Sequence, residues 1–95
     1  MKIKFKNTFL TRVTSQIKYI SKDSPTRARK FKNQLLEAIK EIPNRPLSYR
    51  KSIYFEDDSI RDMIFKGYTI VFRITKDSIE IFGFVKYQKG PTENS

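Results

Sequence analysis

The spacing of hydrophobic and polar residues changes partway along the chain and separates the expected elements into two groups. Residues 2–6 alternate lysine with apolar side chains, a pattern typical of a short strand with one buried face. Over residues 10–42 the apolar positions recur every three or four residues, as they do along one face of an amphipathic helix. From residue 52 onward a two-residue alternation returns. The pattern therefore predicts a strand, then helical structure, then several strands.

The helical region contains two apolar stripes separated by a break at residues 21–25. Asn7 or Thr8 is the expected N-cap of the first helix. The second helix is expected to begin at Ser24-Pro25, because serine caps a helix and proline suits its first position. The stripes consist of Leu10, Val13, Ile17 and Ile20 in the first helix, and Ala28, Phe31, Leu35, Ala38, Ile39 and Ile42 in the second. The short break predicts an antiparallel helical hairpin, which ends at the prolines that follow residue 42.

The second half of the chain predicts antiparallel strands joined by short turns. Candidate strands cover residues 52–55, 60–65, 68–75 and 79–86, and Lys66-Gly67 forms a tight turn in which glycine can adopt a positive φ. In the last strand, strict alternation places Phe82 and Phe84 together on the face away from Ile79 and Ile81. These two phenylalanines then require cover or form an exposed aromatic surface.

These elements predict an α+β fold: an N-terminal strand, an antiparallel helical hairpin, and a three- to four-stranded antiparallel sheet on which the hairpin packs. The chain has 95 residues, of which 38% are hydrophobic, enough for one core. We expect a single domain over residues 1–89 and a frayed polar tail over residues 90–95.

Two missing residue types limit the chemistry. The chain has no cysteine, which excludes disulfides, thiolate nucleophiles and cysteine-ligated zinc, and no histidine, the usual general base near neutral pH. The acidic residues Glu56, Asp57, Asp58 and Asp62 lack the spacing of a calcium loop, so we expect neither a metal nor a cofactor. No apolar run suits a signal peptide or a membrane span, and we expect a cytoplasmic protein with no membrane partner.

The charge balance indicates an anionic partner. The chain has 20 Lys and Arg against 10 Asp and Glu, a formal net charge of +10. Residues 1–55 contain 14 of these cations and three of the acids, and several cations, among them Arg27 and Lys30, lie on the second helix. Such a surface is either an ordinary solvated helix face or a contact for nucleic acid or an acidic protein.

Two further groups of cations are candidates for function. Arg61, Lys66 and Arg73 lie on or beside the central strands, and Arg73 either pairs with Glu80 on the next strand or contacts a phosphate. The segment Lys86-Tyr87-Gln88-Lys89 follows the last strand. Its cations could hold a phosphate and its tyrosine could stack on a base or move a proton, or it could simply be a solvated end. We expect the functional cations to gather at one mouth of the sheet.

Two segments resemble the RelE/ParE superfamily of toxins from type II toxin–antitoxin systems. Residues 61–74 look like its run of basic residue, apolar strand, turn, tyrosine and I-V-[YF]-[RK]-I strand, and residues 79–86 are similar to its final strand. The helix that ends at Ile42-Pro43 is also similar, and the resemblance spans residues 1–89. It implies a small basic toxin that is held inactive by an antitoxin encoded beside it.

The resemblance also implies two possible targets. RelE-like members cleave mRNA in the ribosomal A site without a metal, whereas ParE-like members poison DNA gyrase. This chain has Thr69 where the nuclease branch usually has arginine, Tyr87 where a second cation is expected after Lys86, and no histidine. These departures favour the ParE-like branch.

The leading prediction is a growth-inhibiting ParE-like toxin that forms a hetero-oligomer with an acidic antitoxin. The expected target surface is Arg61, Lys66, Arg73, Lys86, Tyr87 and Lys89, and the expected antitoxin contacts are Phe82, Phe84, Arg27 and Lys30 with the helical hairpin. One alternative is a RelE-like, ribosome-dependent mRNA endonuclease that uses Arg61, Lys86, Tyr87 and Lys89 for catalysis. Another is a non-toxic, basic nucleic-acid-binding module.

Overall fold

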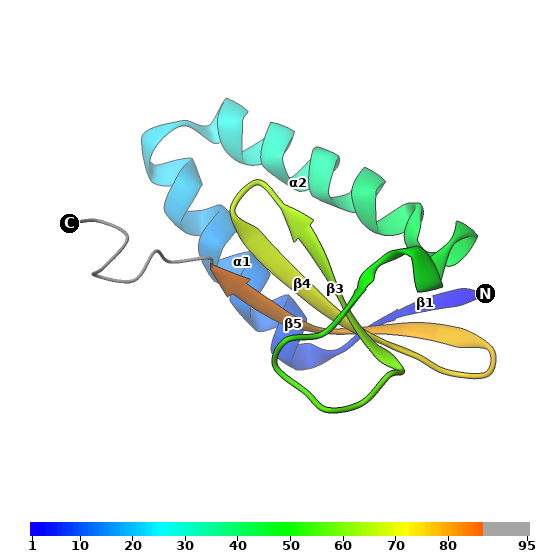
Figure 1. Cartoon of the computed structure of the whole chain (residues 1–95). Helices are drawn as coiled ribbons and strands as arrows, with labels where there is room; N and C mark the ends of the chain where they lie inside the picture. The colour runs from blue at the N-terminus through cyan, green and yellow to red at the C-terminus, as the bar shows by residue number, and fades with distance from the viewer. Residues whose placement is uncertain (87–95) are drawn as a thin grey trace.

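The computed structural model of the chain describes residues 1–86, which form a sheet with a helical hairpin across one face (Figure 1). The predicted tail at residues 90–95 lies outside the described residues. The two long helices are α1 and α2, and two short 3₁₀ turns, η1 and η2, follow α2. In chain order the elements are β1 (Lys2–Phe5), α1 (Asn7–Asp23), α2 (Pro25–Lys40), η1 (Ile42–Asn44), η2 (Pro46–Ser48), β2 (Arg50–Lys51), β3 (Ile60–Phe65), β4 (Tyr68–Ile74) and β5 (Ser78–Lys86).

The five strands form one sheet in the order β1-β5-β4-β3-β2. The pairs β2–β3, β3–β4 and β4–β5 are antiparallel, as predicted. Strand β1 adds a parallel edge strand, with Lys2 opposite Ser78 and Phe5 opposite Ile81. The helical hairpin lies between β1 and the rest of the sheet in sequence, and this long connection permits the parallel pairing. The predicted α+β class is confirmed.

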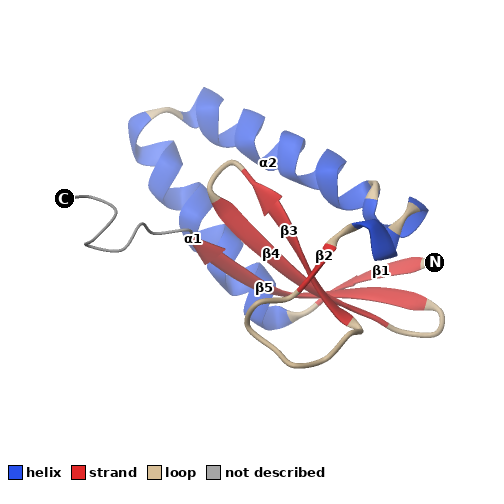
Figure 2. Cartoon of the chain, in the orientation of Figure 1, coloured by secondary structure: helices blue, strands red, loops and turns tan. Residues whose placement is uncertain are grey.

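The core lies between the hairpin and one face of the sheet (Figure 2). Phe72 and Ile70 of β4, together with Ile79 and Ile81 of β5, are completely buried there. The hairpin covers them with the buried residues of α1 and α2, which include Leu35 and Ile39. Neither helix in residues 1–86 is both long and apolar enough to cross a membrane.

The start of α2 agrees with the sequence pattern, and the start of α1 does not. Ser24 Oγ accepts a hydrogen bond from the Arg27 backbone N–H at 3.1 Å, and Pro25 is the first helical residue. The N-cap of α1 is Lys6, without a side-chain hydrogen bond, because the Thr8 hydroxyl instead donates to the Phe82 carbonyl at 2.7 Å. The prediction that Asn7 or Thr8 caps α1 is therefore wrong.

The buried stripe of α1 begins one residue earlier than predicted. Phe9 is 2% exposed, whereas Leu10 is 42% exposed. Phe9 packs edge-on against Phe84 of β5, with 6.0 Å between the ring centroids. This aromatic contact, together with Val13 one turn later, turns Phe9 toward the sheet and leaves Leu10 near the outside of the hairpin.

The strand predicted at residues 52–55 is also wrong, because β2 ends at Lys51 and a loop follows. The backbone N–H of Ile53 donates to Asp62 Oδ2 at 3.1 Å, and that of Tyr54 donates to Ser52 Oγ at 3.1 Å. Side chains thus take the donors that a strand would offer to a neighbouring strand. Figure 2 shows this loop on the side of the sheet away from the helices.

Strand β5 contains a bulge that reverses its alternation. Val71 of β4 lies opposite Gly83, but the next residue, Phe72, lies opposite Ile81, so Phe82 is the extra residue. After the bulge Phe84 faces the helices and is 5% exposed, while Phe82 lies on the other face against Phe55. The prediction that Phe82 and Phe84 share one face is therefore wrong.

Candidate functional site

The predicted target-binding cations divide between two ends of the sheet. Arg73 lies opposite Ile60 at one end, beside Arg61, whereas Lys66 and Lys86 lie at the other end, where Lys86 is opposite Tyr68. Tyr68 and Arg73 are five residues apart on β4, a separation of about 17 Å. The described members of the predicted surface therefore form two groups rather than one. Tyr87 and Lys89 lie outside the described residues.

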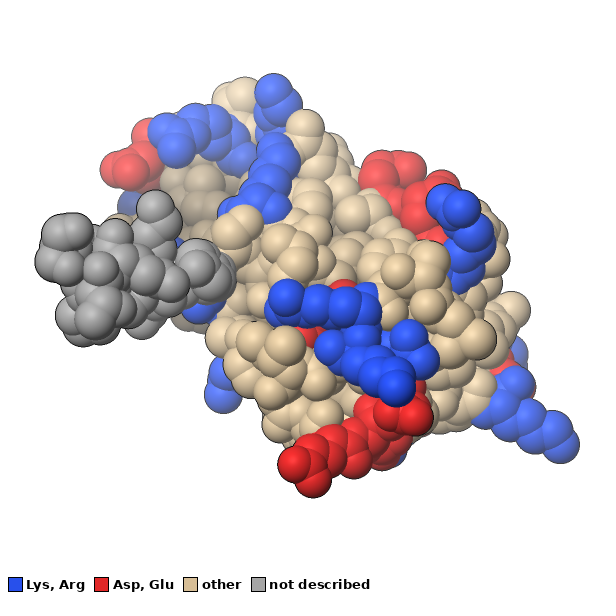
Figure 3. All heavy atoms as spheres, in the orientation of Figure 1, with Lys and Arg blue, Asp and Glu red and all other residues tan. Residues whose placement is uncertain are grey.

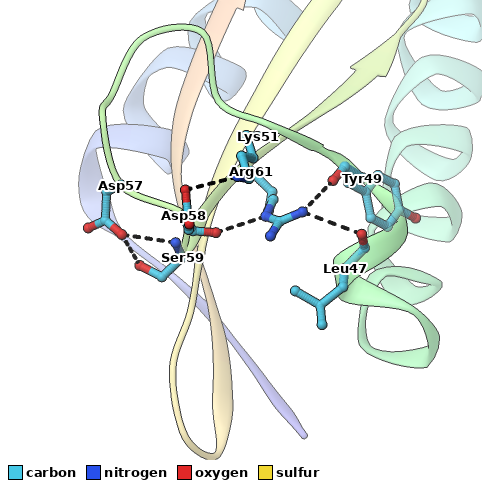
Figure 4. A network of polar contacts seen from close by, with 7 residues as sticks. All are labelled: Leu47, Tyr49, Lys51, Asp57, Asp58, Ser59 and Arg61. Atoms are coloured by element: carbon cyan, nitrogen blue, oxygen red, sulfur yellow. Dashed lines mark hydrogen bonds and ion pairs between the residues drawn. The ribbon is translucent and has the colours of Figure 1, made fainter.

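Arg61 is held by backbone carbonyl groups (Figure 4). Its Nε donates to the Asp58 carbonyl at 2.9 Å, and its Nη1 donates to the carbonyls of Tyr49 at 3.0 Å and Leu47 at 3.4 Å. These carbonyls belong to the segments before β2 and before β3. The guanidinium therefore joins these two segments to each other and to β3.

We expect Arg61→Ala to lower the free energy of unfolding by about 2 kcal/mol. Each hydrogen bond from a charged donor contributes about 1.5–3 kcal/mol, and water that hydrogen-bonds to the freed carbonyls in the variant offsets part of the loss. Arg61→Lys should not restore the loss, since one ammonium cannot serve carbonyls in three directions. Urea unfolding of both variants measures the effect, with the exposed Arg29→Ala on α2 as a control. Unchanged unfolding together with lost toxicity would instead assign Arg61 to target binding.

Arg73 does not pair with Glu80, which was one of the two alternatives expected for it, although the two residues are opposite each other in the register. Its Nη1 lies 3.3 Å from Asp57 Oδ2, and the two side chains are 44% and 43% exposed. The hydroxyl and the backbone N–H of Ser59 both donate to Asp57 Oδ1, and with Arg73 they hold the pKa of Asp57 below its ordinary value of 3.8. An exposed pair of this kind adds little to stability.

Two of the other acidic residues weighed as metal ligands, Asp62 and Asp58, are used in similar ways. Asp62 is buried and lies 3.3 Å from Arg50 Nη2, and Asp58 lies 3.3 Å from Lys51 Nζ. Each carboxylate thus faces a different cation on β2. Within residues 1–86, no three His, Cys, Asp or Glu side chains come together as a metal site would require.

The helical hairpin carries an apolar groove, which we call the hairpin groove. It has a volume of about 370 Å³ and lies between α1, α2 and the end of β1. Lys18 and Lys32 add two cations to a lining that is otherwise almost entirely apolar. Its apolar lining consists of Phe5, Phe9, Leu10, Val13, Ile17, Leu35 and Leu36. Leu10 and Leu36 lie beside the buried stripes of their helices. Apolar residues next to a buried stripe could have indicated this groove from the sequence.

The four residues predicted to contact an antitoxin lie in three separate places. Phe84 is buried beneath the hairpin and offers no surface. Phe82 is half-buried on the opposite face of the sheet. Arg27 and Lys30 lie on the flank of α2 that faces the β3–β4 turn, in a second cleft with Lys66. The hairpin groove, by contrast, is an exposed apolar surface on the predicted hairpin, which the prediction named only as a whole.

A family model matches nearly the whole sequence, and a solved structure shares the fold. The sequence matches, over residues 3–89, the family described as "ParE toxin of type II toxin-antitoxin system, parDE". The fold is similar to a solved structure titled "Chromosomal ParDE TA system from P. aeruginosa", with a TM-score of 0.75 and 15% sequence identity, covering 93% of this chain and 97% of that one. None of the curated proteins matches the sequence. The structural likeness concerns the fold, and the family match covers nearly the whole sequence.

Proposed function

We propose, from the premise that the chain belongs to the ParE toxin family of type II toxin–antitoxin systems, that this toxin arrests growth by binding DNA gyrase. We further propose that an acidic antitoxin neutralises it by occupying the hairpin groove. The gyrase assignment follows the ParE-like branch that the sequence favours.

Binding, rather than RNA cleavage, is supported by the separation of Arg61 from Lys86. A ribonuclease needs its proton-transfer groups and its phosphate-binding cations within hydrogen-bond reach of one phosphate. Arg61 lies opposite Phe72 and Lys86 lies opposite Tyr68, four residues apart on β4, which corresponds to about 14 Å. The Arg61 guanidinium is also engaged by three carbonyls. This separation is the observation that carries the proposal.

A supercoiling assay with purified gyrase tests the target. The full-length toxin should inhibit supercoiling of relaxed plasmid or cause cleaved plasmid to accumulate, and it should leave relaxation by topoisomerase I unchanged. Transcript 5′ ends mapped after induction should show no new cuts. Codon-dependent cuts in translated messages, with normal supercoiling, would overturn the proposal in favour of the RelE-like endonuclease.

The hairpin groove suits an amphipathic segment with acidic residues. Apolar side chains of such a segment would bury the exposed parts of Leu10 and Phe5, and acidic side chains beside them would meet Lys18 and Lys32. The lysines of β1 extend the positive charge along the adjoining sheet edge. Opposite charge on the two partners would also speed their association at low salt.

A further inference from the structure

We propose that a cleft between the start of α2 and the β3–β4 turn binds the phosphate backbone of duplex DNA. The proposal rests on the proposed function in one respect: gyrase holds duplex DNA, so a toxin with this site would contact the enzyme and its DNA together. We call this site the basic cleft. It is lined by Ile20, Arg27, Lys30, Phe31, Gln34, Lys66 and Tyr68.

The three cations of the basic cleft have no acidic partner among the described residues. Every ion pair within residues 1–86 joins other cations, and Lys66 Nζ donates instead to the neutral amide oxygen of Gln34. Figure 3 shows Lys and Arg side chains gathered over the α1–α2 end of the hairpin. The cleft therefore concentrates positive charge that an anion could neutralise.

The backbone holds Lys66 in place at a cost. Lys66 has φ +47° and Gly67 has φ +82°, which together make the two-residue turn between β3 and β4. Asparagine or glycine adopts the first of these conformations more readily than lysine does. The turn also brings the Lys66 ammonium toward α2, where Arg27 and Lys30 already lie. An anion bound among the three would offset both the backbone strain and the repulsion between like charges.

Tyr68 supplies a rigid hydrogen-bond donor to the same cleft. Its ring packs between Phe31 and Phe84, with centroid distances of 5.4 and 4.9 Å. Its hydroxyl oxygen accepts a hydrogen bond from Gln16 Nε2 at 2.8 Å, which leaves the hydroxyl proton available to another acceptor. Phosphate oxygens accept hydrogen bonds of this kind, and such contacts position a protein on the DNA backbone.

The lining of the cleft favours DNA over an acidic peptide. A docked peptide needs several apolar anchors, and the hairpin groove offers seven apolar residues, whereas the basic cleft sets Ile20 and Phe31 beside three cations and so carries more charge in its lining. Residues 27, 30 and 34 follow helical spacing along one flank of α2, and the hairpin groove uses Lys32 and Leu36 on the other flank. Lys86 continues the positive charge at the end of β5, beside Tyr68. A row of cations suits the successive phosphates of a polymer.

Fluorescence anisotropy with a labelled duplex of about 20 base pairs, measured at several salt concentrations, tests the cleft. The variant is Arg27→Gln with Lys66→Asn, since asparagine suits the turn and preserves the fold. Losing two phosphate contacts should reduce the slope of log K against log salt by about 1.8, which is about a 60-fold loss of affinity at 0.1 M salt. The matched control, Arg29→Gln with Lys40→Gln, removes the same total charge from exposed positions of α2 outside both the cleft and the hairpin groove and should weaken binding far less.

An equal loss of DNA affinity in the cleft variant and in the control would overturn the proposal, and so would an unchanged salt slope in the cleft variant. A third contrary result is displacement of the labelled duplex by a polyglutamate peptide but not by unlabelled duplex. The supercoiling assay separates this failure from that of the proposed function. If the toxin inhibits gyrase but its DNA affinity is the same with and without the cleft substitutions, only the DNA-binding proposal for the cleft is rejected. If the cleft substitutions weaken DNA binding but the toxin does not inhibit gyrase, only the proposal that gyrase is the target is rejected.

Discussion

Leu10→Asp is expected to weaken antitoxin binding by about 100-fold, which is about 2.7 kcal/mol. Leu10 is 42% exposed and lines the hairpin groove, so aspartate would remove an apolar anchor and place a negative charge against an acidic partner. The folded toxin should tolerate the change, because Leu10 lies outside the buried stripe and near the start of α1, where a negative charge is favourable. Isothermal titration calorimetry with the cognate antitoxin measures the loss.

The matched control is Tyr19→Asp on the same helix. Tyr19 is 64% exposed and does not line the hairpin groove, so the control introduces the same charge without touching the proposed surface. Its position near the end of α1 makes aspartate less favourable there than at residue 10. An antitoxin affinity that survives Leu10→Asp, or one that falls equally in both variants, would show that the antitoxin binds elsewhere.

Alanine at position 83 will destabilise the fold by about 2 kcal/mol, because its methyl group has no room. An ideal Cβ at Gly83 would lie 2.8 Å from Val71 Cβ and 3.0 Å from Val71 Cγ2. Both residues lie where the bulge brings β4 and β5 together, so relief requires a shift of the strands or of the valine. Urea denaturation of Gly83→Ala measures the loss of stability.

A double-mutant cycle identifies the cause of that loss. Val71→Gly removes both obstructing atoms, Cβ and Cγ2, so Gly83→Ala should cost about 1 kcal/mol less in the Val71→Gly background. The control is Gly67→Ala, where nothing lies within 4 Å of the added Cβ but φ is +82°. Its cost arises from the backbone and should not depend on Val71. Additive effects at positions 83 and 71 would contradict the crowding that the bulge creates.

Features that depend on neighbouring residues in the chain were predictable. The Ser24-Pro25 start of α2 and the Lys66-Gly67 turn are each specified by the residues that form them. The apolar stripe of α2 follows from spacing alone, because residues three and four apart share a helix face. The antiparallel order of β3, β4 and β5 follows from the short turns between them.

The errors occurred where a residue's environment is set by a distant segment. The loop after β2 takes its shape from Asp62, and Arg73 finds Asp57 in that loop instead of Glu80 on the adjacent strand. The bulge at Phe82 depends on how β5 pairs with β4, and it alone separates Phe82 from Phe84. No local pattern reports these pairings, because each requires two segments to be in place before the contact exists.

The sequence by itself determined the fold class, the helical hairpin and the excess of positive charge, since these follow from residue types and their spacing, and its resemblance to known toxins indicated the family. Only the tertiary structure decided which cations lie together. Residues close in sequence, such as Arg61 and Lys66, lie toward opposite ends of an extended strand, whereas Arg27 and Lys66, 39 positions apart, line one cleft. The physical reason is that an extended strand rises about 3.4 Å per residue, so neighbours in sequence soon lie far apart along it. Packing of a helix against a turn instead brings together side chains that are distant in sequence.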